Sequence, residues 1–254
     1  GKVGYDTQFL ETYDSRAAEV GFAAPAFDDS EWEHASIREH ADYTLIPQET
    51  KTLAFETIAP VVQEVHGNVV FVDFGSTYVG YLTATAVGAP GDTVEIRCGQ
   101  ELSEDGTVRH KLRANCDYVE NWILSGCADT LDWFDFKSFR YAELVLPTGV
   151  TVSDIRLIAR HYPFTLAAEL APAFAGDEDL RRIWDLCVHT LQYGVQEVIQ
   201  DCMEREKGFY VGDGCYTAYA HMQLTGDDTI VRKLIDDAFR STFITPGMVT
   251  CLDC

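Results

Sequence analysis

The chain has 254 residues, 46% of them hydrophobic, which is enough to bury a sizeable core in one large or two modest domains. Its 41 acidic and 19 basic residues give a net charge of −22, and a surface of that charge repels phosphate backbones and anionic membranes. We therefore expect neither a nucleic-acid partner nor a membrane partner.

Cysteine usage favours a cytoplasmic protein. The eight cysteines occur at irregular spacings, mostly inside apolar runs, which is typical of reduced core thiols rather than of a disulfide framework. The sequence has no apolar run of about 18 residues, and its start, Gly1-Lys2-Val3, does not resemble a signal peptide. Cys251 and Cys254 have the spacing of a metal-ligand pair, but no second pair or nearby histidine completes a zinc site. We expect no metal and no cofactor.

Residues 1–50 are polar and contain too little periodic apolar sequence to form a core alone. A turn-like cluster occurs at 27–32, and a short apolar piece at 43–46 precedes Pro47. We expect this segment to pack on the domain that begins after residue 50 or to belong to a preceding domain.

Residues 51–168 carry dense β-strand signals separated by Gly, Pro, Asp and Ser clusters. The expected strands lie at 69–75, 78–87, 93–98, 117–125, 130–136, 139–147 and 152–161. No helical crossover lies between them, so the pattern predicts an antiparallel β-sandwich rather than a parallel sheet. We expect Trp122, Trp133 and Phe134 to lie in its core.

The hydrophobic period becomes helical after Pro172. Asp177 can cap a helix whose apolar side chains, from Leu180 to Val198, form one stripe that faces a core. Helical spacing returns at 215–224 and 230–239. Two or three helices cannot close a large helical domain, so 169–254 is interpreted as the truncated start of one.

The segment 201–213 concentrates the polar chemistry of the chain. It holds four carboxylates, two bases, two aromatics and two glycines: Asp201, Glu204, Glu206, Asp213, Arg205, Lys207, Phe209, Tyr210, Gly208 and Gly212. Crowded carboxylates repel one another, so one of them can hold its proton near neutral pH. We expect Asp201, Glu206 and Asp213 to surround a ligand from the end of a helix and the loop after it.

Cleavage of a glycosidic bond needs a protonated carboxyl as donor and a second carboxylate as base or nucleophile. We assign Glu206 as the donor, whose protonation Arg205 and Lys207 oppose if they turn inward. Phe209, Tyr210 and Tyr216 can offer an apolar face to a sugar, although aromatic residues more often fill a core.

Other chemistries lack their central residues. No Gly-x-Ser-x-Gly elbow or phosphate-binding glycine loop occurs, and no paired base lies beside Cys202. The histidines are scattered, without a helical zinc-site pair, and are interpreted as structural.

The segment Asp201-Cys202-Met203-Glu204-Arg205-Glu206, with Gly212-Asp213, resembles the signature of bacterial α-L-rhamnosidases, family 78 of the glycoside hydrolases. Segments 72–75, 91–94, 100–107 and 139–141 resemble the β-sandwich domain of that family, and 27–32 resembles the end of an earlier jelly-roll module. Met203 replaces the usual proline, and Phe209-Tyr210 stands where tryptophan is common. The resemblance implies that an (α/α)6 barrel, a six-hairpin glycosidase fold, begins in 169–254.

The resemblance further implies that Glu206 is the general acid and that Asp201 and Asp213 hold rhamnose hydroxyls. Arg205 matches a signature position and can bind or orient a carboxylate. The family's general base is a glutamate far downstream, beyond Cys254, so we expect an inactive fragment of an inverting hydrolase of terminal α-L-rhamnosides. The alternatives are a non-catalytic carbohydrate-binding or architectural β-sandwich module, and the same fold acting on a different glycoside.

Overall fold

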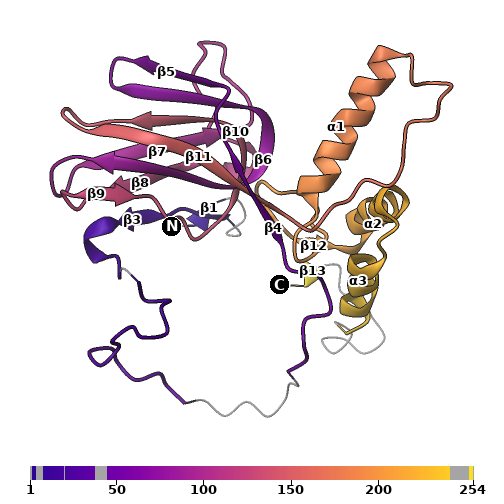
Figure 1. Cartoon of the computed structure of the whole chain (residues 1–254), viewed down its shortest axis with the longest axis horizontal. Helices are drawn as coiled ribbons and strands as arrows, with labels where there is room; N and C mark the ends of the chain where they lie inside the picture. The colour runs from indigo at the N-terminus through magenta and orange to yellow at the C-terminus, as the bar shows by residue number, and fades with distance from the viewer. Residues whose placement is uncertain (1, 4–7, 20, 38–44, 241–251, 254) are drawn as a thin grey trace.

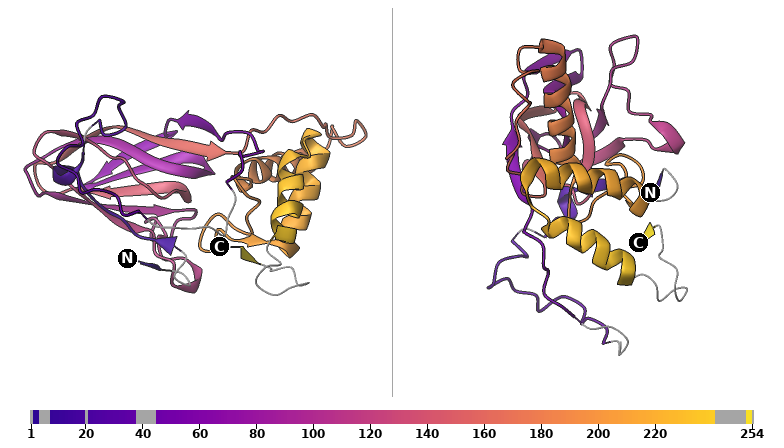
Figure 2. Two further views of the ribbon diagram at one scale, coloured as in Figure 1. Left: turned by 90° about the horizontal axis from the view of Figure 1, so that it is seen from below. Right: turned by 90° about the vertical axis from the view of Figure 1, so that its right-hand side faces the viewer.

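The computed structural model describes residues 2–3, 8–19, 21–37, 45–240 and 252–253. A curled β-sheet forms one part of the molecule and three helices lie together beside one end of it (Figure 1). The views in Figure 2 show the same side-by-side arrangement. No helix in these described ranges is both long and apolar enough to cross a membrane.

The described part of the chain contains one nine-stranded sheet. Its main strand order is β3-β8-β7-β10-β6-β11-β4, and β5 and β9 also pair with β6. All pairs are antiparallel except β3 with β8. The strands are β3 (Thr12–Asp14), β4 (Ala54–Ile58), β5 (Val62–His66), β6 (Val69–Val87), β7 (Thr93–Gly99), β8 (Val119–Ile123), β9 (Ala128–Thr130), β10 (Lys137–Val145) and β11 (Thr151–His161).

Strand β6 gives the sheet its curl. Its first part pairs with β5 and β10, and its last part pairs with β11 and β9. The two segments expected at 69–75 and 78–87 are therefore one bent strand rather than two. The antiparallel β-rich domain is confirmed, but its strands curl within one sheet instead of forming two separate sheets, because the long β6 belongs to both sides of the bend.

The bend lies where β6 loses register with β10. Pairing runs from Phe139 with Tyr78 directly to Tyr141 with Asp73, so β6 carries extra residues opposite Arg140. The Arg140 guanidinium closes this bulge with two 2.7 Å hydrogen bonds to the Asp73 carboxylate. Asp73 also accepts the Gly75 N–H at 2.7 Å, and these contacts hold its pKa below the ordinary value.

One glycine permits the close approach of β6 and β11. A Cβ atom at Gly80 would lie 2.0 Å from the carbonyl oxygen of Ile158, so no side chain fits there. The core of the sheet is built on such close strand pairing, with Val72, Ala86 and Leu144 fully buried.

The helices are α1 (Glu178–Gly194), α2 (Val211–Thr225) and α3 (Thr229–Arg240). Asp177 caps α1 by accepting the Leu180 N–H at 3.1 Å, as the sequence predicts. Beside α2 and α3 lies a smaller core that contains Tyr162, Val195, Ile199, Phe209 and Leu234. The short strands β12 (Phe209–Tyr210) and β13 (Leu252–Asp253) pair nearby, and β1 (Lys2–Val3) pairs with β2 (Gln8–Phe9).

Several local expectations are corrected by the structure. Helix α1 ends at Gly194 rather than continuing to Val198, and its residues Ile183 and Leu186 are 56% and 65% exposed instead of facing a core. Trp122 and Trp133 are buried as expected, but Phe134 is 91% exposed, because burial alternates along 131–134 and Phe134 falls on the side opposite Trp133. The division of the chain at about residue 168 stays a prediction. Cys251 and Cys254 lie outside the described residues.

The buried ion pair between Lys137 and Glu120 predicts an asymmetric response to mutation. Their side chains are 4% and 2% exposed, with Nζ and Oε1 2.5 Å apart, and burial raises the pKa of Glu120 while Lys137 opposes that shift. Lys137→Met should lower the free energy of unfolding by about 3–5 kcal/mol, because Glu120 loses its partner. Adding Glu120→Gln should recover part of that loss in urea unfolding. Equal losses in the single and double variants would contradict the argument.

The buried imidazole of His221 predicts acid sensitivity. Neither ring nitrogen has a hydrogen-bond partner among the described residues, and burial lowers the pKa of His221, opposed by Asp227 and assisted by Lys51. The unfolded chain therefore binds a proton more readily, and stability falls as the pH drops below about 6.5, by at most about 1.4 kcal/mol per pH unit. His221→Phe should flatten this slope in unfolding measured from pH 7 to 5. The exposed-site control His34→Gln should not, and equal slopes in all three proteins would reject the assignment.

Candidate active site

The segment that carries the expected site forms a closed loop between α1 and α2. The Asp201 N–H donates to the Gly208 carbonyl, and the Gly208 N–H donates to Asp201 Oδ1, both at 2.9 Å. These reciprocal bonds bring the two ends of the loop together and leave residues 202–207 projecting between them. The carboxylate of Asp201 thus shapes the loop and lies at its base.

The middle of the loop is bound to the β-sheet. The Tyr118 hydroxyl, on a side chain that is 1% exposed, donates to the Glu204 carbonyl at 2.6 Å. The Met203 side chain packs against the main core. The loop therefore rests on the sheet, although the sequence places it among the helices.

The two bases beside Glu206 point in different directions. Arg205 forms an ion pair with Glu206, with Nη2 and Oε1 3.0 Å apart, whereas Lys207 reaches into the sheet and pairs with Asp135 at 3.0 Å. The Glu206 side chain is 18% exposed. Only one of the two cations expected to influence Glu206 therefore pairs with it.

Arg205 is the centre of the charge arrangement in this loop. Burial acts to lower its pKa, but negative charge at Cys202, Glu206, Glu204 and Asp201 outweighs burial and raises the pKa above the ordinary value. The guanidinium also lies 3.9 Å from the Cys202 sulfur. Glu206 is the loop carboxylate that forms an ion pair with Arg205, while Asp201 and Glu204 act on the Arg205 pKa through their charge.

Asp213 and the aromatic pair occupy different surroundings. Asp213 is exposed in the first turn of α2 rather than in a loop, where the positive end of the helix dipole favours its charge. Phe209 is 4% exposed in the helical core, and this burial favours a packing role; Tyr210 beside it is half-buried. Tyr216 is 83% exposed on α2.

A cavity of about 530 Å³ adjoins the loop on the side of the sheet. Asp201 and Glu204 line it from the loop, Arg140 from β10 and Tyr193 from α1. Its size and its position between sheet and helices are those of a small-molecule site. Among the described residues, no group of three or more His, Cys, Asp and Glu side chains could hold a metal ion.

The arrangement provides a carboxyl, Glu206, that is only partly exposed to water and is held next to a cation. Of the residues expected to form the site, Asp201 lines the cavity and Glu206 does not. These residues were predicted from the sequence, but Tyr118 and Asp135, which lie just before β8 and β10 and hold the loop, were not. Both lie far from the loop in the sequence, and neither carries a motif that could have signalled the contact.

Comparisons with known proteins agree with this architecture. Residues 63–157 match the family model of the bacterial α-L-rhamnosidase concanavalin-like domain. An α-L-rhamnosidase of Streptomyces avermitilis is 28% identical over 172 residues, which is 63% of this chain and 16% of that protein.

Solved structures of α-L-rhamnosidases share the fold. The enzyme from Dictyoglumus thermophilum superposes with a TM-score of 0.80 at 23% identity, over 95% of this chain and 28% of its own. The Streptomyces avermitilis structure, a complex with L-rhamnose, gives a TM-score of 0.78 at 21% identity, over 99% of this chain and 25% of its own. The chain thus spans about a quarter of the length of these two structures.

The curled sheet over residues 63–157 is of the concanavalin-like class found in bacterial α-L-rhamnosidases. The chain is related to the α-L-rhamnosidases of glycoside hydrolase family 78 and covers their concanavalin-like domain region, which confirms the resemblance seen in its sequence.

The hydrogen bond from Tyr118 to the Glu204 carbonyl predicts a measurable loss in the free energy of unfolding when it is removed. Tyr118→Phe removes only the hydroxyl that binds the Glu204 carbonyl, and should lower the free energy of unfolding by about 0.5–1.5 kcal/mol. Urea unfolding checks this. The loss should be smaller for Tyr219→Phe, whose side chain is 64% exposed. Equal effects of the two substitutions would show that the bond does not fix the loop.

Proposed function

We propose that this chain supplies the acid half of an inverting α-L-rhamnosidase active site that acts on terminal α-L-rhamnosides. Glu206 donates the proton to the leaving glycosidic oxygen, and a glutamate outside this chain activates the attacking water. The observation that carries the proposal is the position of Glu206, which is 18% exposed on a closed loop in a chain related to α-L-rhamnosidases. The ion pair with Arg205 favours the charged carboxylate, so Arg205 is assigned an orienting role alone.

The other residues of the loop bind the sugar in this proposal. Asp201 keeps its second carboxylate oxygen for a ring hydroxyl, because Oδ1 already accepts the Gly208 N–H. Asp213, exposed at the start of α2, accepts a second hydroxyl, and Arg205 orients Glu206. Tyr210 and Phe209 complete the wall, with the half-buried Tyr210 nearer to a ligand than the buried Phe209. The L-rhamnose bound to the Streptomyces avermitilis relative supports the choice of sugar.

We also propose that α1, α2 and α3 begin an (α/α)6 barrel. The exposed apolar side chains of α1, such as Ile183 and Leu186, support this, because further helices would bury them. The general base would then come from a later helical hairpin, and residues 1–254 alone would show no hydrolysis. A cytoplasmic location likewise stays a prediction.

The test is Glu206→Gln in the protein at its full natural length, assayed on an aryl α-L-rhamnoside. Gln cannot donate a proton to the leaving group, so kcat should fall by about 10²–10⁴-fold while thermal unfolding is unchanged. Glu64→Gln, on β5 with a side chain that is 56% exposed, is the matched control and should retain most activity. Survival of activity in Glu206→Gln would reject the acid role, and activity only on other aryl glycosides would change the sugar alone.

A further inference from the structure

Lys207 makes an unusual set of contacts for a lysine in a surface-facing loop. Its Nζ lies 3.0 Å from both carboxylate oxygens of Asp135, donates to the Phe136 carbonyl at 2.5 Å, and lies 4.0 Å from the centre of the Phe136 ring. The side chain is only 11% exposed. An ammonium group has three donors, and these contacts direct them to the Asp135 carboxylate and the Phe136 carbonyl, just before β10.

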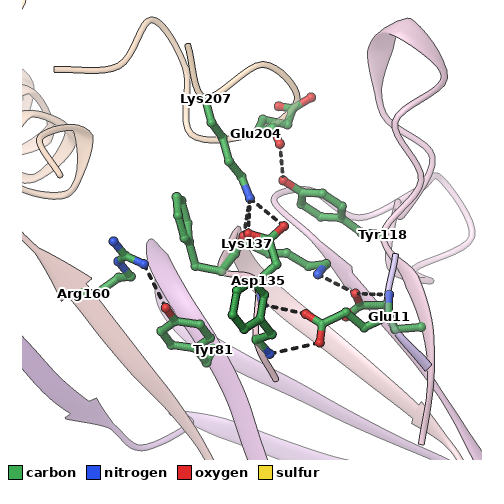
Figure 3. Close-up of polar contacts among 11 residues, drawn as sticks. Glu11, Tyr81, Tyr118, Asp135, Lys137, Arg160, Glu204 and Lys207 are labelled. Carbon is green, nitrogen blue, oxygen red and sulfur yellow. Dashed lines mark hydrogen bonds and ion pairs between the residues drawn. The ribbon is translucent and has the colours of Figure 1, made fainter. Parts of the chain in front are cut away.

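Figure 3 shows the contact of Lys207 with Asp135 and the nearby hydrogen bond from Arg160 to Tyr81. Two cations lie near the Phe136 ring: the Arg160 guanidinium is 4.3 Å from its centre and the Lys207 Nζ is 4.0 Å from it. Arg160 is fixed in turn by the Tyr81 hydroxyl at 2.8 Å and by Glu197 at 2.6 Å. Arg160 therefore joins the sheet to the segment after α1.

The Asp135 carboxylate is fixed through its own backbone. Its N–H donates to Glu11 at 2.6 Å, and the neighbouring Phe134 N–H donates to the same carboxylate at 3.0 Å. The Glu11 N–H donates to Glu120, the partner of Lys137. Lys207 thus attaches the loop to the segment before β10, which Glu11 holds through two backbone hydrogen bonds.

We propose that Lys207 is a positioning residue that holds Glu206 at the place where it protonates the leaving group, so that the β-domain takes part in catalysis. This inference rests on the proposed function of Glu206. Lys207 follows Glu206 directly, and consecutive Cα atoms are about 3.8 Å apart, so fixing Lys207 fixes the backbone that carries the acid. Lys207 also has a φ of +53°, a left-handed conformation that a non-glycine residue keeps only when its surroundings impose it.

The two cations that flank Glu206, Arg205 and Lys207, pair with different carboxylates. Because Lys207 is directed into the sheet, its charge is compensated there by Asp135, and Arg205 is the cation that remains beside Glu206. Removing the Lys207 ammonium removes the contacts with Asp135 and Phe136 that fix the loop end, and a misplacement of about 1 Å in an active site costs on the order of 10²-fold in rate. The effect falls on proton donation, since Lys207 itself touches neither the sugar nor the reacting atoms in this proposal.

The experiment compares two substrates that differ in their need for an acid. Phenyl α-L-rhamnoside has a basic leaving group that requires protonation, whereas 2,4-dinitrophenyl α-L-rhamnoside departs with little help. Lys207→Met, which keeps the apolar stem and removes the charge, is made in the protein at its full natural length. We expect kcat on the phenyl substrate to fall at least about tenfold more than kcat on the dinitrophenyl substrate, with KM nearly unchanged.

Three further variants make the result specific. Asp135→Asn removes the partner charge but keeps the N–H that binds Glu11, so it should show the same substrate dependence and decides the question if Lys207→Met does not fold. Lys207→Arg restores a cation and should recover part of the loss. Lys233→Met removes the Lys233–Asp237 ion pair of α3 and is the matched control, with kinetics expected to be unchanged on both substrates.

The positioning role would be overturned if Lys207→Met lowered kcat equally on the two substrates, because a merely structural change lowers both rates alike. If Lys207→Met does not fold, the same criterion applies to Asp135→Asn. Glu206→Gln on the same pair of substrates tests the proposed function separately. If Glu206→Gln shows no dependence on the leaving group, Glu206 is not the acid, whatever Lys207 does. If Glu206→Gln shows the dependence and the deciding variant does not, the function stands and the positioning role fails.

Discussion

The attachment of the 201–208 loop to the β-sheet is the constraint on which the rest of the site depends. Lys207 joins the loop to Asp135 and Phe136, and Tyr118 holds it at Glu204. The reciprocal bonds between Asp201 and Gly208 close it. A loop of this polarity would otherwise be mobile in water, since its carboxylates repel one another. The sheet therefore gives a fixed geometry to side chains that the helical part presents.

Other cations also join separate segments of the described structure through ion pairs. The chain has 19 basic residues against 41 acidic ones, so a buried cation readily finds an acidic partner. Arg140 closes the bulge of β6 on Asp73, Lys137 pairs with Glu120 in the sheet, and Arg160 joins the sheet to Glu197 after α1. Each cation ties segments that are distant in sequence. These pairs place buried or half-buried cations against carboxylates, so part of the excess negative charge is compensated inside the fold.

Local sequence patterns predicted those elements whose structure depends on contacts between residues close together in the chain. The cap at Asp177 and the strands near 93–98 and 152–161 follow from side-chain hydrogen bonding and alternation within a few residues. The single curled sheet did not follow, because the bend of β6 depends on register with β10. The end of α1 at Gly194 was missed because tertiary contacts override the local pattern: Val195 is extended and its carbonyl accepts the Tyr162 N–H. The exposure of Phe134 follows from alternation along 131–134, which places it opposite the buried Trp133.

The sequence by itself determined the kinds of element, the relationship to α-L-rhamnosidases and the residues that carry charge in the 201–213 segment, because these depend on residue type and short spacing. Only the tertiary structure decided where the charges point. Arg205 and Lys207 flank Glu206 equally in the sequence, yet one pairs with it and the other is drawn into the sheet by Asp135. That choice depends on a carboxylate about 70 residues away in the chain, and only folding brings the two groups within hydrogen-bonding distance.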